Sequence, residues 1–145
     1  MRSRWSRRHK SFSRERQPIV ADRSTRLRSV LIIDDDPDVR ETLVDALSLE
    51  GLNVAAVENG LEALEWLRAH LDLEWLVLLD LMMPVMDGRT FLLKRAADPA
   101  LATIPVLIFT AGGDCHELKR LHDIAGCLHK TVDFQQLLAA VRAVG

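Results

Sequence analysis

The sequence predicts an α/β protein in which a parallel sheet carries helices on both faces. Short apolar runs alternate with segments whose apolar residues recur at helical spacing. The apolar runs are too short for helices and too continuously apolar for half-exposed strands, which is typical of strands buried on both faces. Polar or charged residues follow several of these runs. In an open parallel sheet that position is the edge where ligands bind.

Five segments are predicted to be strands. They are residues 30–33, 52–57, 75–79, 105–109 and 126–129. The last of them is the weakest, because Gly126 and His129 flank only two apolar residues.

Five helices are predicted between and after these strands. Four of them cover residues 37–50, 61–71, 89–97 and 134–141, and the remaining short helix is lined by Leu118, Leu121 and Ile124. Asp36 is suited to cap the first helix and Pro37 to occupy its first position, where a missing N–H costs nothing. Gly51 ends that helix. Asp87 and Asp133 are predicted caps of two later helices.

Strict alternation of strands and helices favours a doubly wound sheet, because parallel strands need right-handed crossover connections. We therefore predict a flavodoxin-like, five-stranded parallel sheet of order 2-1-3-4-5 with five helices. Residues 29–145 would form this single domain, and residues 1–28 a tail.

The tail and the domain carry opposite charge. Residues 1–28 hold ten Lys and Arg against two acidic residues, a balance of +8, and the remainder holds nine against nineteen, a balance of -10. An Arg- and Ser-rich segment without apolar periodicity is predicted to be disordered. A solvated tail without a specific partner is the favoured interpretation. Binding to nucleic acid, a membrane or the acidic domain, a transit peptide, and a downstream translation start are the alternatives.

Composition excludes several classes. No apolar run approaches the roughly 20 residues that span a bilayer, and no apolar core of a signal peptide follows the basic N-terminus. The expected location is the cytoplasm. Cys115 and Cys127, the only cysteines, form no C-x-x-C pair, so we expect neither a disulfide nor a zinc site. Both are interpreted as plain small side chains.

The residues that follow the predicted strands form a chemical pattern. Asp34, Asp35 and Asp36 follow the first strand, Asp80 the third, and Thr110 and Lys130 the fourth and fifth. Converging carboxylates need a cation, and oxygen ligands favour Mg²⁺. A metal, an ammonium and a hydroxyl together cradle the oxygens of a phosphoryl group, and an aspartate beside them can be its acceptor.

On these residues the sequence from 29 to 145 resembles the receiver domains of bacterial response regulators (CheY-like, two-component signalling). The first match is Val-Leu-Ile-Ile-Asp-Asp-Asp-Pro at 30–37, where the resemblance implies that Asp34 and Asp35 bind Mg²⁺. The second is Asp-Leu-Met-Met-Pro-Val-Met-Asp-Gly at 80–88, which implies that Asp80 is the phosphoacceptor and a metal ligand. Met82 would lend its backbone carbonyl to the metal.

The remaining matches concern the switch. Thr110 in Ile-Pro-Val-Leu-Ile-Phe-Thr-Ala at 104–111 falls on the signalling hydroxyl, and Lys130 on the lysine that contacts phosphate. The resemblance implies a phosphoryl donor, either a sensor histidine kinase or a histidine phosphotransfer protein. It also implies a switch in the face formed by residues 118–141 and a downstream target protein. Homodimerisation through that face is an open alternative.

Four features depart from the family pattern. Thr131 follows Lys130 where the family has a proline with a cis bond, so a trans bond is expected here. Cys127 stands where the family has its switch aromatic. The segment between Thr110 and Lys130 is about two residues short, and Met82 is bulky enough to slow attack by water.

The leading hypothesis is a stand-alone receiver, a phosphoacceptor switch rather than an enzyme, with at most phosphorylation from small donors and slow autodephosphorylation. The alternative is a degenerate receiver that acts as an interaction module without phosphorylation. An aspartyl-phosphate hydrolase is weaker because Met82 replaces its second carboxylate. A nucleic-acid effector rests on the basic tail alone.

Overall fold

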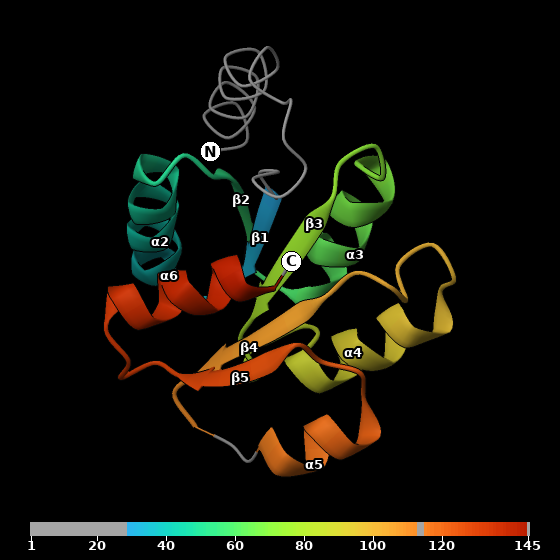
Figure 1. Ribbon diagram of the computed structural model, residues 1–145. Helices are drawn as coiled ribbons and strands as arrows, with labels where there is room; N and C mark the ends of the chain where they lie inside the picture. The colour runs from blue at the N-terminus through green and yellow to red at the C-terminus, as the bar shows by residue number, and fades with distance from the viewer. Residues whose placement is uncertain (1–28, 113–114, 145) are drawn as a thin grey trace.

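The computed structural model describes residues 29–112 and 115–144. These form one parallel sheet of order β2-β1-β3-β4-β5, as the sequence predicts (Figure 1). The strands are β1 (Ser29–Ile33), β2 (Asn53–Val57), β3 (Trp75–Leu79), β4 (Val106–Thr110) and β5 (Gly126–His129). The helices are α2 (Pro37–Leu49), α3 (Gly60–Ala69), α4 (Gly88–Ala97), α5 (Cys115–Leu121) and α6 (Phe134–Ala143). The predicted tail, residues 1–28, lies outside the described residues.

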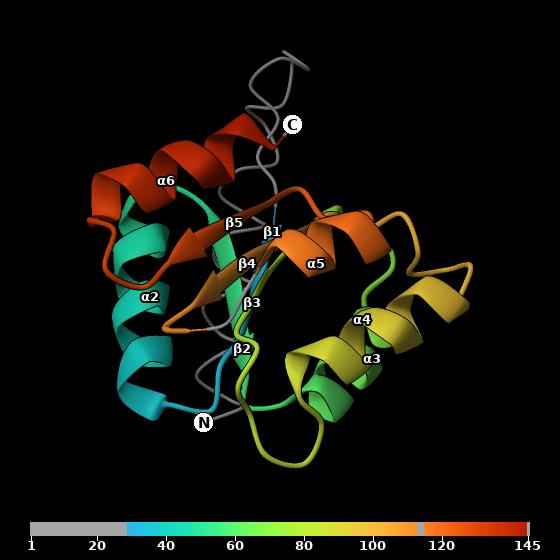
Figure 2. The ribbon, with the colours of Figure 1, turned by 90° about the horizontal axis from the view of Figure 1, so that it is seen from below.

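The helices cover the sheet in two layers (Figure 2). Leu64, Phe91 and Leu118, from α3, α4 and α5, lie in the apolar cluster on one face. Leu47 and Leu138, from α2 and α6, lie in the cluster on the other face. Because both faces are covered, β1, β3 and β4 are buried along their whole length. This explains their continuous apolar runs.

Strand register brings the predicted site residues to one edge. Ile33 is level with Leu79 in the β1–β3 pair, so Asp34 and Asp80 each lie one residue beyond the same level. Thr110, the last residue of β4, is level with His129 of β5, so Lys130 follows directly. The sheet therefore presents these four side chains together at the carboxyl ends of its strands.

Capping residues set the helix boundaries. The side chain of Asp36 accepts a hydrogen bond from the Asp38 backbone N–H, and Pro37 follows it. Asp87 accepts from the Thr90 N–H, and Asp133 forms a reciprocal capping box with Gln136. The predictions for these three caps are confirmed.

Two helices end earlier than predicted. α3 ends at Ala69, so Leu71 lies beyond it. α5 spans Cys115–Leu121, so Leu118 and Leu121 lie on it as predicted but Ile124 lies beyond its end. Ile124 instead packs against the apolar cluster from the connection to β5. The apolar spacing alone extended the helix too far, because an apolar residue in a packed loop looks the same in sequence as one on a helix face.

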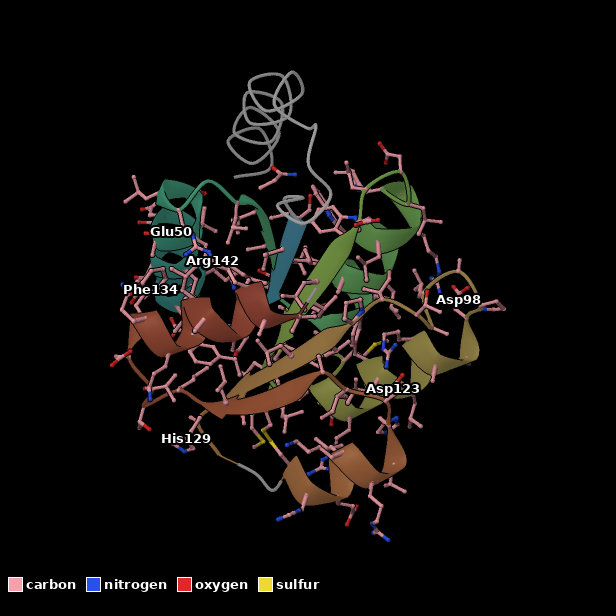
Figure 3. All side chains as sticks on the ribbon, viewed as in Figure 1. Glu50, Asp98, Asp123, His129, Phe134 and Arg142 are labelled. Carbon is pink, nitrogen blue, oxygen red and sulfur yellow. A yellow bond between two sulfur atoms is a disulfide. The ribbon has the colours of Figure 1, made fainter. Side chains whose placement is uncertain are left out.

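Charged side chains tie distant elements together. Arg142 of α6 pairs with Glu50 at the end of α2, with 3.2 Å between Nη2 and Oε1 (Figure 3). Arg95 of α4 is buried and donates to the backbone carbonyls of Ala102, Ile104 and Asp123.

Within the described residues, none of the helices has the length and apolar character needed to cross a bilayer.

Candidate functional site

Three carboxylates gather at the carboxyl edge of the sheet. Oxygen atoms of Asp34, Asp35 and Asp80 lie within 4.8 Å of one another. Asp34 is 2% exposed and Asp80 is 6% exposed, whereas Asp35 faces solvent. Two buried carboxylates beside a third make a site of high negative charge with only oxygen ligands. This donor set fits a hard divalent cation such as Mg²⁺, with the exposed side open for water or phosphoryl oxygens.

Lys130 reaches into this cluster from the end of β5. Its Nζ lies 2.6 Å from Oδ2 of Asp34 and 3.4 Å from Oδ2 of Asp80. Burial of the ammonium is the largest single influence and would lower the pKa of Lys130, but hydrogen bonding and attraction from both carboxylates outweigh it. The pKa of Lys130 is therefore raised, and the ammonium keeps its charge.

Thr110 contacts the other oxygen of Asp80. Its Oγ1 lies 3.2 Å from Asp80 Oδ1 and 2.9 Å from the backbone carbonyl of Gly112. A hydroxyl has one proton to donate, so these two acceptors compete for it. Asp80 is thus flanked by an ammonium on one oxygen and a hydroxyl on the other.

The loop after β1 is held by groups that we did not predict. Arg40 is buried although it lies on α2, and its Nη1 donates to the backbone carbonyl of Asp34 at 2.6 Å. The Asp36 N–H donates to Asp34 Oδ1 at 2.9 Å. A signal was present in the sequence, because Arg40 stands on the same helical stripe as Val44 and Leu47.

The loop after β3 is shaped by close packing. A Cβ atom on Gly88 would lie 2.6 Å from the Asp80 carbonyl oxygen, so only glycine permits this approach. Met82 is 71% exposed, and its backbone N–H lies 3.4 Å from Asp80 Oδ1. Its predicted role, donation of a carbonyl to the metal, stays a prediction.

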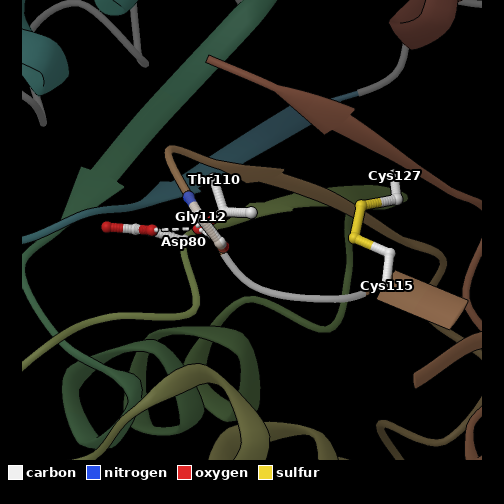
Figure 4. Close-up of a disulfide and its surroundings, with 5 residues drawn as sticks. All are labelled: Asp80, Thr110, Gly112, Cys115 and Cys127. Atoms are coloured by element: carbon white, nitrogen blue, oxygen red, sulfur yellow. Dashed lines mark hydrogen bonds between the residues drawn. A yellow bond between two sulfur atoms is a disulfide. The ribbon is translucent and has the colours of Figure 1, made fainter. Parts of the chain in front are cut away.

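Cys115 and Cys127 form a disulfide, so the interpretation of both as plain small side chains is wrong (Figure 4). Cys127 lies on β5 opposite Ile108, and Cys115 begins α5. The sequence separation of 12 residues concealed the pair, because only the fold of α5 back onto β5 brings their Cα atoms to 6.3 Å.

The expected trans bond after Lys130 is confirmed. The described part of the chain contains no cis peptide bond, so the Lys130–Thr131 bond is trans. The Thr131 hydroxyl lies 3.0 Å from Nδ1 of His129, so it contacts the residue before Lys130.

A groove of about 420 Å³ lies at the opposite edge of the sheet. It is lined in part by Trp75, which begins β3, and Pro105, which precedes β4. Because these residues mark the amino ends of the strands, the groove is separate from the carboxylate cluster.

Residues 30–142 match the response regulator receiver domain family. The chain belongs to this family. Phosphorylation and Mg²⁺ binding are general to receiver domains. The predicted flavodoxin-like fold with strand order 2-1-3-4-5 is confirmed as well.

Two curated relatives and one solved structure illustrate the similarity. Response regulator Rre1 of Synechocystis is 36% identical over 79% of this chain and 50% of its own length. The transcriptional regulatory protein CpxR homolog of Haemophilus influenzae is 33% identical over 81% of this chain and 50% of its own length. The structure of the chemotaxis response regulator CheY4 of Vibrio cholerae superposes on this chain with a TM-score of 0.73. The superposition covers 83% of this chain and 100% of the CheY4 chain. The two sequences are 23% identical, so this similarity supports the fold alone. The chain spans about half the length of these curated relatives.

Proposed function

We propose that Asp80 accepts a phosphoryl group from a phosphohistidine on a sensor histidine kinase or a histidine phosphotransfer protein. The observation that carries the proposal is the convergence of Asp80 with Asp34, Asp35, Thr110 and Lys130 at one edge of the sheet. This constellation supplies an acceptor oxygen, a cation site, a hydroxyl and an ammonium, which are the parts that phosphoryl transfer needs.

In the transfer, a carboxylate oxygen of Asp80 attacks phosphorus while the phosphorus–nitrogen bond of the donor breaks. The imidazole leaves and an acyl phosphate forms on Asp80. Asp34 and Asp35, with the Met82 carbonyl, would hold Mg²⁺, which when bound supplies positive charge to the phosphoryl oxygens. Lys130 would exchange its contact with Asp34 for one with a phosphoryl oxygen, and Thr110 would donate to another.

The consequence of phosphorylation in this proposal is a change in protein contacts. Thr110 and Lys130 flank α5 and β5 along the chain, so their movement toward phosphate would be passed to these elements and to α6. We place the protein in the cytoplasm as a phosphoacceptor switch rather than an enzyme. A downstream target protein would read the altered face.

The simplest form of the proposal is a response regulator that acts as a single domain. Immunoblotting of the source cells tests this form, since the chain of 145 residues has a mass of 16.3 kDa. A band of this mass supports it. A substantially larger band would mean that the receiver works as part of a longer protein.

The chemistry is tested by intact mass after incubation with Mg²⁺ and acetyl phosphate. We expect one phosphoryl adduct on the wild type and none without Mg²⁺ or in Asp80→Asn. Asp36→Asn is the matched control, because Asp36 neighbours the cluster but serves as a helix cap that asparagine can replace. This variant should form the adduct.

Absence of an adduct from acetyl phosphate, followed by absence from a phosphorylated kinase domain, would overturn the proposal. The degenerate receiver, an interaction module that works without phosphorylation, would then replace it. An adduct that persists in Asp80→Asn would place the acceptor elsewhere.

A further inference from the structure

Cys115 and Cys127 occupy a position that links them to the candidate site. Thr110 precedes Cys115 by five residues, and Lys130 follows Cys127 by three. The backbone N–H of Lys130 donates to the Thr110 carbonyl at 2.9 Å, which closes β5 onto β4. The disulfide (Figure 4) therefore joins two points inside the segment between Thr110 and Lys130. This segment contains all of α5.

The attachment of α5 to the rest of the molecule is slight without this bond. The helix has seven residues, of which Leu118 is buried. A helix this short is not stable by itself in water, so its position depends on tertiary contacts. Arg95 holds the connection that follows the helix through the Asp123 carbonyl. The disulfide is thus the covalent anchor of the other end of α5, the one nearer to Thr110.

The two cysteines are positioned to bond to each other, and neither is fully buried. Both cysteines are partly buried and pack against the apolar cluster of α3, α4 and α5, so neither is sealed in the core. Their Cα separation of 6.3 Å falls in the range that a disulfide spans without movement of the backbone. In the cytoplasm that we propose for this protein, disulfides are usually transient and redox-sensing rather than structural.

We propose that Cys115 and Cys127 form a reversible thiol–disulfide site, oxidised and reduced by low-molecular-weight disulfides and thiols of the glutathione class. The redox state of this site sets how firmly the end of α5 nearest to Thr110 is held. In oxidation, a protein thiolate attacks the small disulfide and releases one small thiol. The second cysteine then attacks the mixed disulfide and releases another. The protein loses two protons and two electrons, which the small disulfide gains.

The link to signalling follows from the hydrogen bonds of Thr110. Its hydroxyl lies nearer to the Gly112 carbonyl than to Asp80. Donation to a phosphoryl group on Asp80 ends the hydrogen bond from this hydroxyl to the Gly112 carbonyl, and Gly112 precedes Cys115 by three residues. A covalent anchor at Cys115 restrains the movement of Thr110 toward phosphate, so the oxidised protein should be phosphorylated more slowly. The redox chemistry stands apart from the proposed function, whereas this effect on phosphorylation rests on it.

The redox chemistry is tested on the full chain by equilibration in buffers of different glutathione-to-glutathione-disulfide ratio. Thiols are then alkylated, and intact mass is measured. We expect a reversible change between a form with two alkylated cysteines and a form with none, centred at one ratio. Cys115→Ser and Cys127→Ser should each stop at a mixed disulfide with glutathione. Two alkylated cysteines at every ratio, or a bond that resists reduction in the folded protein, would overturn the proposal.

The effect on the fold and on signalling is tested on the same samples. Amide hydrogen exchange should be several-fold faster in residues 115–121 of the reduced protein, and Asp80 should be phosphorylated several-fold faster from acetyl phosphate. The Cys115→Ser/Cys127→Ser double variant should match the reduced protein with or without oxidant. Equal exchange and equal phosphorylation in both redox states would overturn the regulatory claim. Absence of phosphorylation in both states, with normal redox titration, would instead count against the proposed function.

Discussion

At the scale of single residues, the site is an arrangement of opposite charges that partly satisfy one another. The Nζ atom of Lys130 lies 2.6 Å from Oδ2 of Asp34 and 3.4 Å from Oδ2 of Asp80, so it is closer to Asp34. Removal of the ammonium would leave two buried carboxylates together without a cationic partner, which is costly at low dielectric. The same excess of negative charge attracts a divalent cation, and that cation together with Lys130 would attract the oxygens of a phosphoryl group.

Val85 departs from ordinary backbone geometry in the loop that follows Asp80. Its φ is 70°, and the Met86 N–H donates to the Pro84 carbonyl at 2.8 Å across it. This is the geometry of a γ-turn that β-branched residues adopt with strain. The side chain is 79% exposed, so it gains little from packing.

We predict that Val85→Gly raises the free energy of unfolding by about 1 kcal/mol, because relief of the strain exceeds the added entropy of the unfolded chain. Urea denaturation measures the change. Val85→Ala is the control, since alanine keeps the Cβ atom and should not share the gain. Equal stabilities of the two variants would show that the φ of Val85 carries no cost.

At the scale of elements, helix caps fix where each loop of the site ends. Asp87 caps α4 immediately before Gly88, which touches the backbone of Asp80. Hydrogen bonds from the Thr90 backbone and side chain lower the pKa of Asp87, because they favour the charged carboxylate. The cap therefore couples the stability of α4 to pH.

We predict that Asp87→Ala lowers the free energy of unfolding at neutral pH by about 1 kcal/mol through loss of the cap. A lowered pKa means that the extra stability of the charged cap is present above the ordinary value of 3.8 and is lost as the pH falls through the lower folded value. The difference between wild type and Asp87→Ala, measured by urea denaturation from pH 7 downward, should shrink in that range. Asp87→Asn should differ less from the wild type at neutral pH, because asparagine also caps.

Arg95 joins α4 to two segments that precede β4 and β5. Burial lowers the pKa of Arg95 and the charge of Asp123 opposes this, while the guanidinium donates to three backbone carbonyls. The planar guanidinium of this single side chain thus supplies hydrogen bonds to all three carbonyls.

We predict that Arg95→Met destabilises the protein by about 3 kcal/mol, because buried carbonyls lose their donors. Arg95→Lys should recover part of the lost stability, since an ammonium restores the positive charge but not the planar arrangement of donors. Thermal and urea unfolding measure both. A methionine variant as stable as the wild type would mean that water replaces the guanidinium without cost.

At the scale of the whole molecule, the fold gathers three carboxylates at one edge of the sheet, and Lys130 alone does not neutralise their charge. Asp34 and Asp35 come from the loop after β1, and Asp80 from the loop after β3, so a cation bound to all three would join two loops. A ligand that binds only the folded protein adds to its stability.

We predict that Mg²⁺ stabilises the protein by about 2.7 kcal/mol at roughly 100 times its Kd, and that a chelator reverses the effect. Differential scanning calorimetry measures the rise in Tm. Asp34→Asn and Asp35→Asn should weaken the response, and Asp36→Asn should keep it. The same rise with a monovalent salt at equal ionic strength would show general screening rather than a site.

The sequence by itself determined the sheet order, the strand boundaries to within about a residue, and the caps at Asp36, Asp87 and Asp133. These depend on local rules: a buried strand must be apolar throughout, and a helix start needs an acceptor side chain. The meeting of Asp34, Asp80, Thr110 and Lys130 was also predictable, because parallel strands end at one edge. Their chemical roles remain proposals.

Only the tertiary structure decided the features that depend on distance between segments. The Cys115–Cys127 bond, the buried Arg40 and the contact of Gly88 with the Asp80 backbone each join residues whose separation is set by packing. A sequence pattern records the periodicity of one segment, whereas these contacts arise where two segments approach. The end of α5 before Ile124 has the same cause, since tertiary contacts rather than its own apolar spacing place a seven-residue helix.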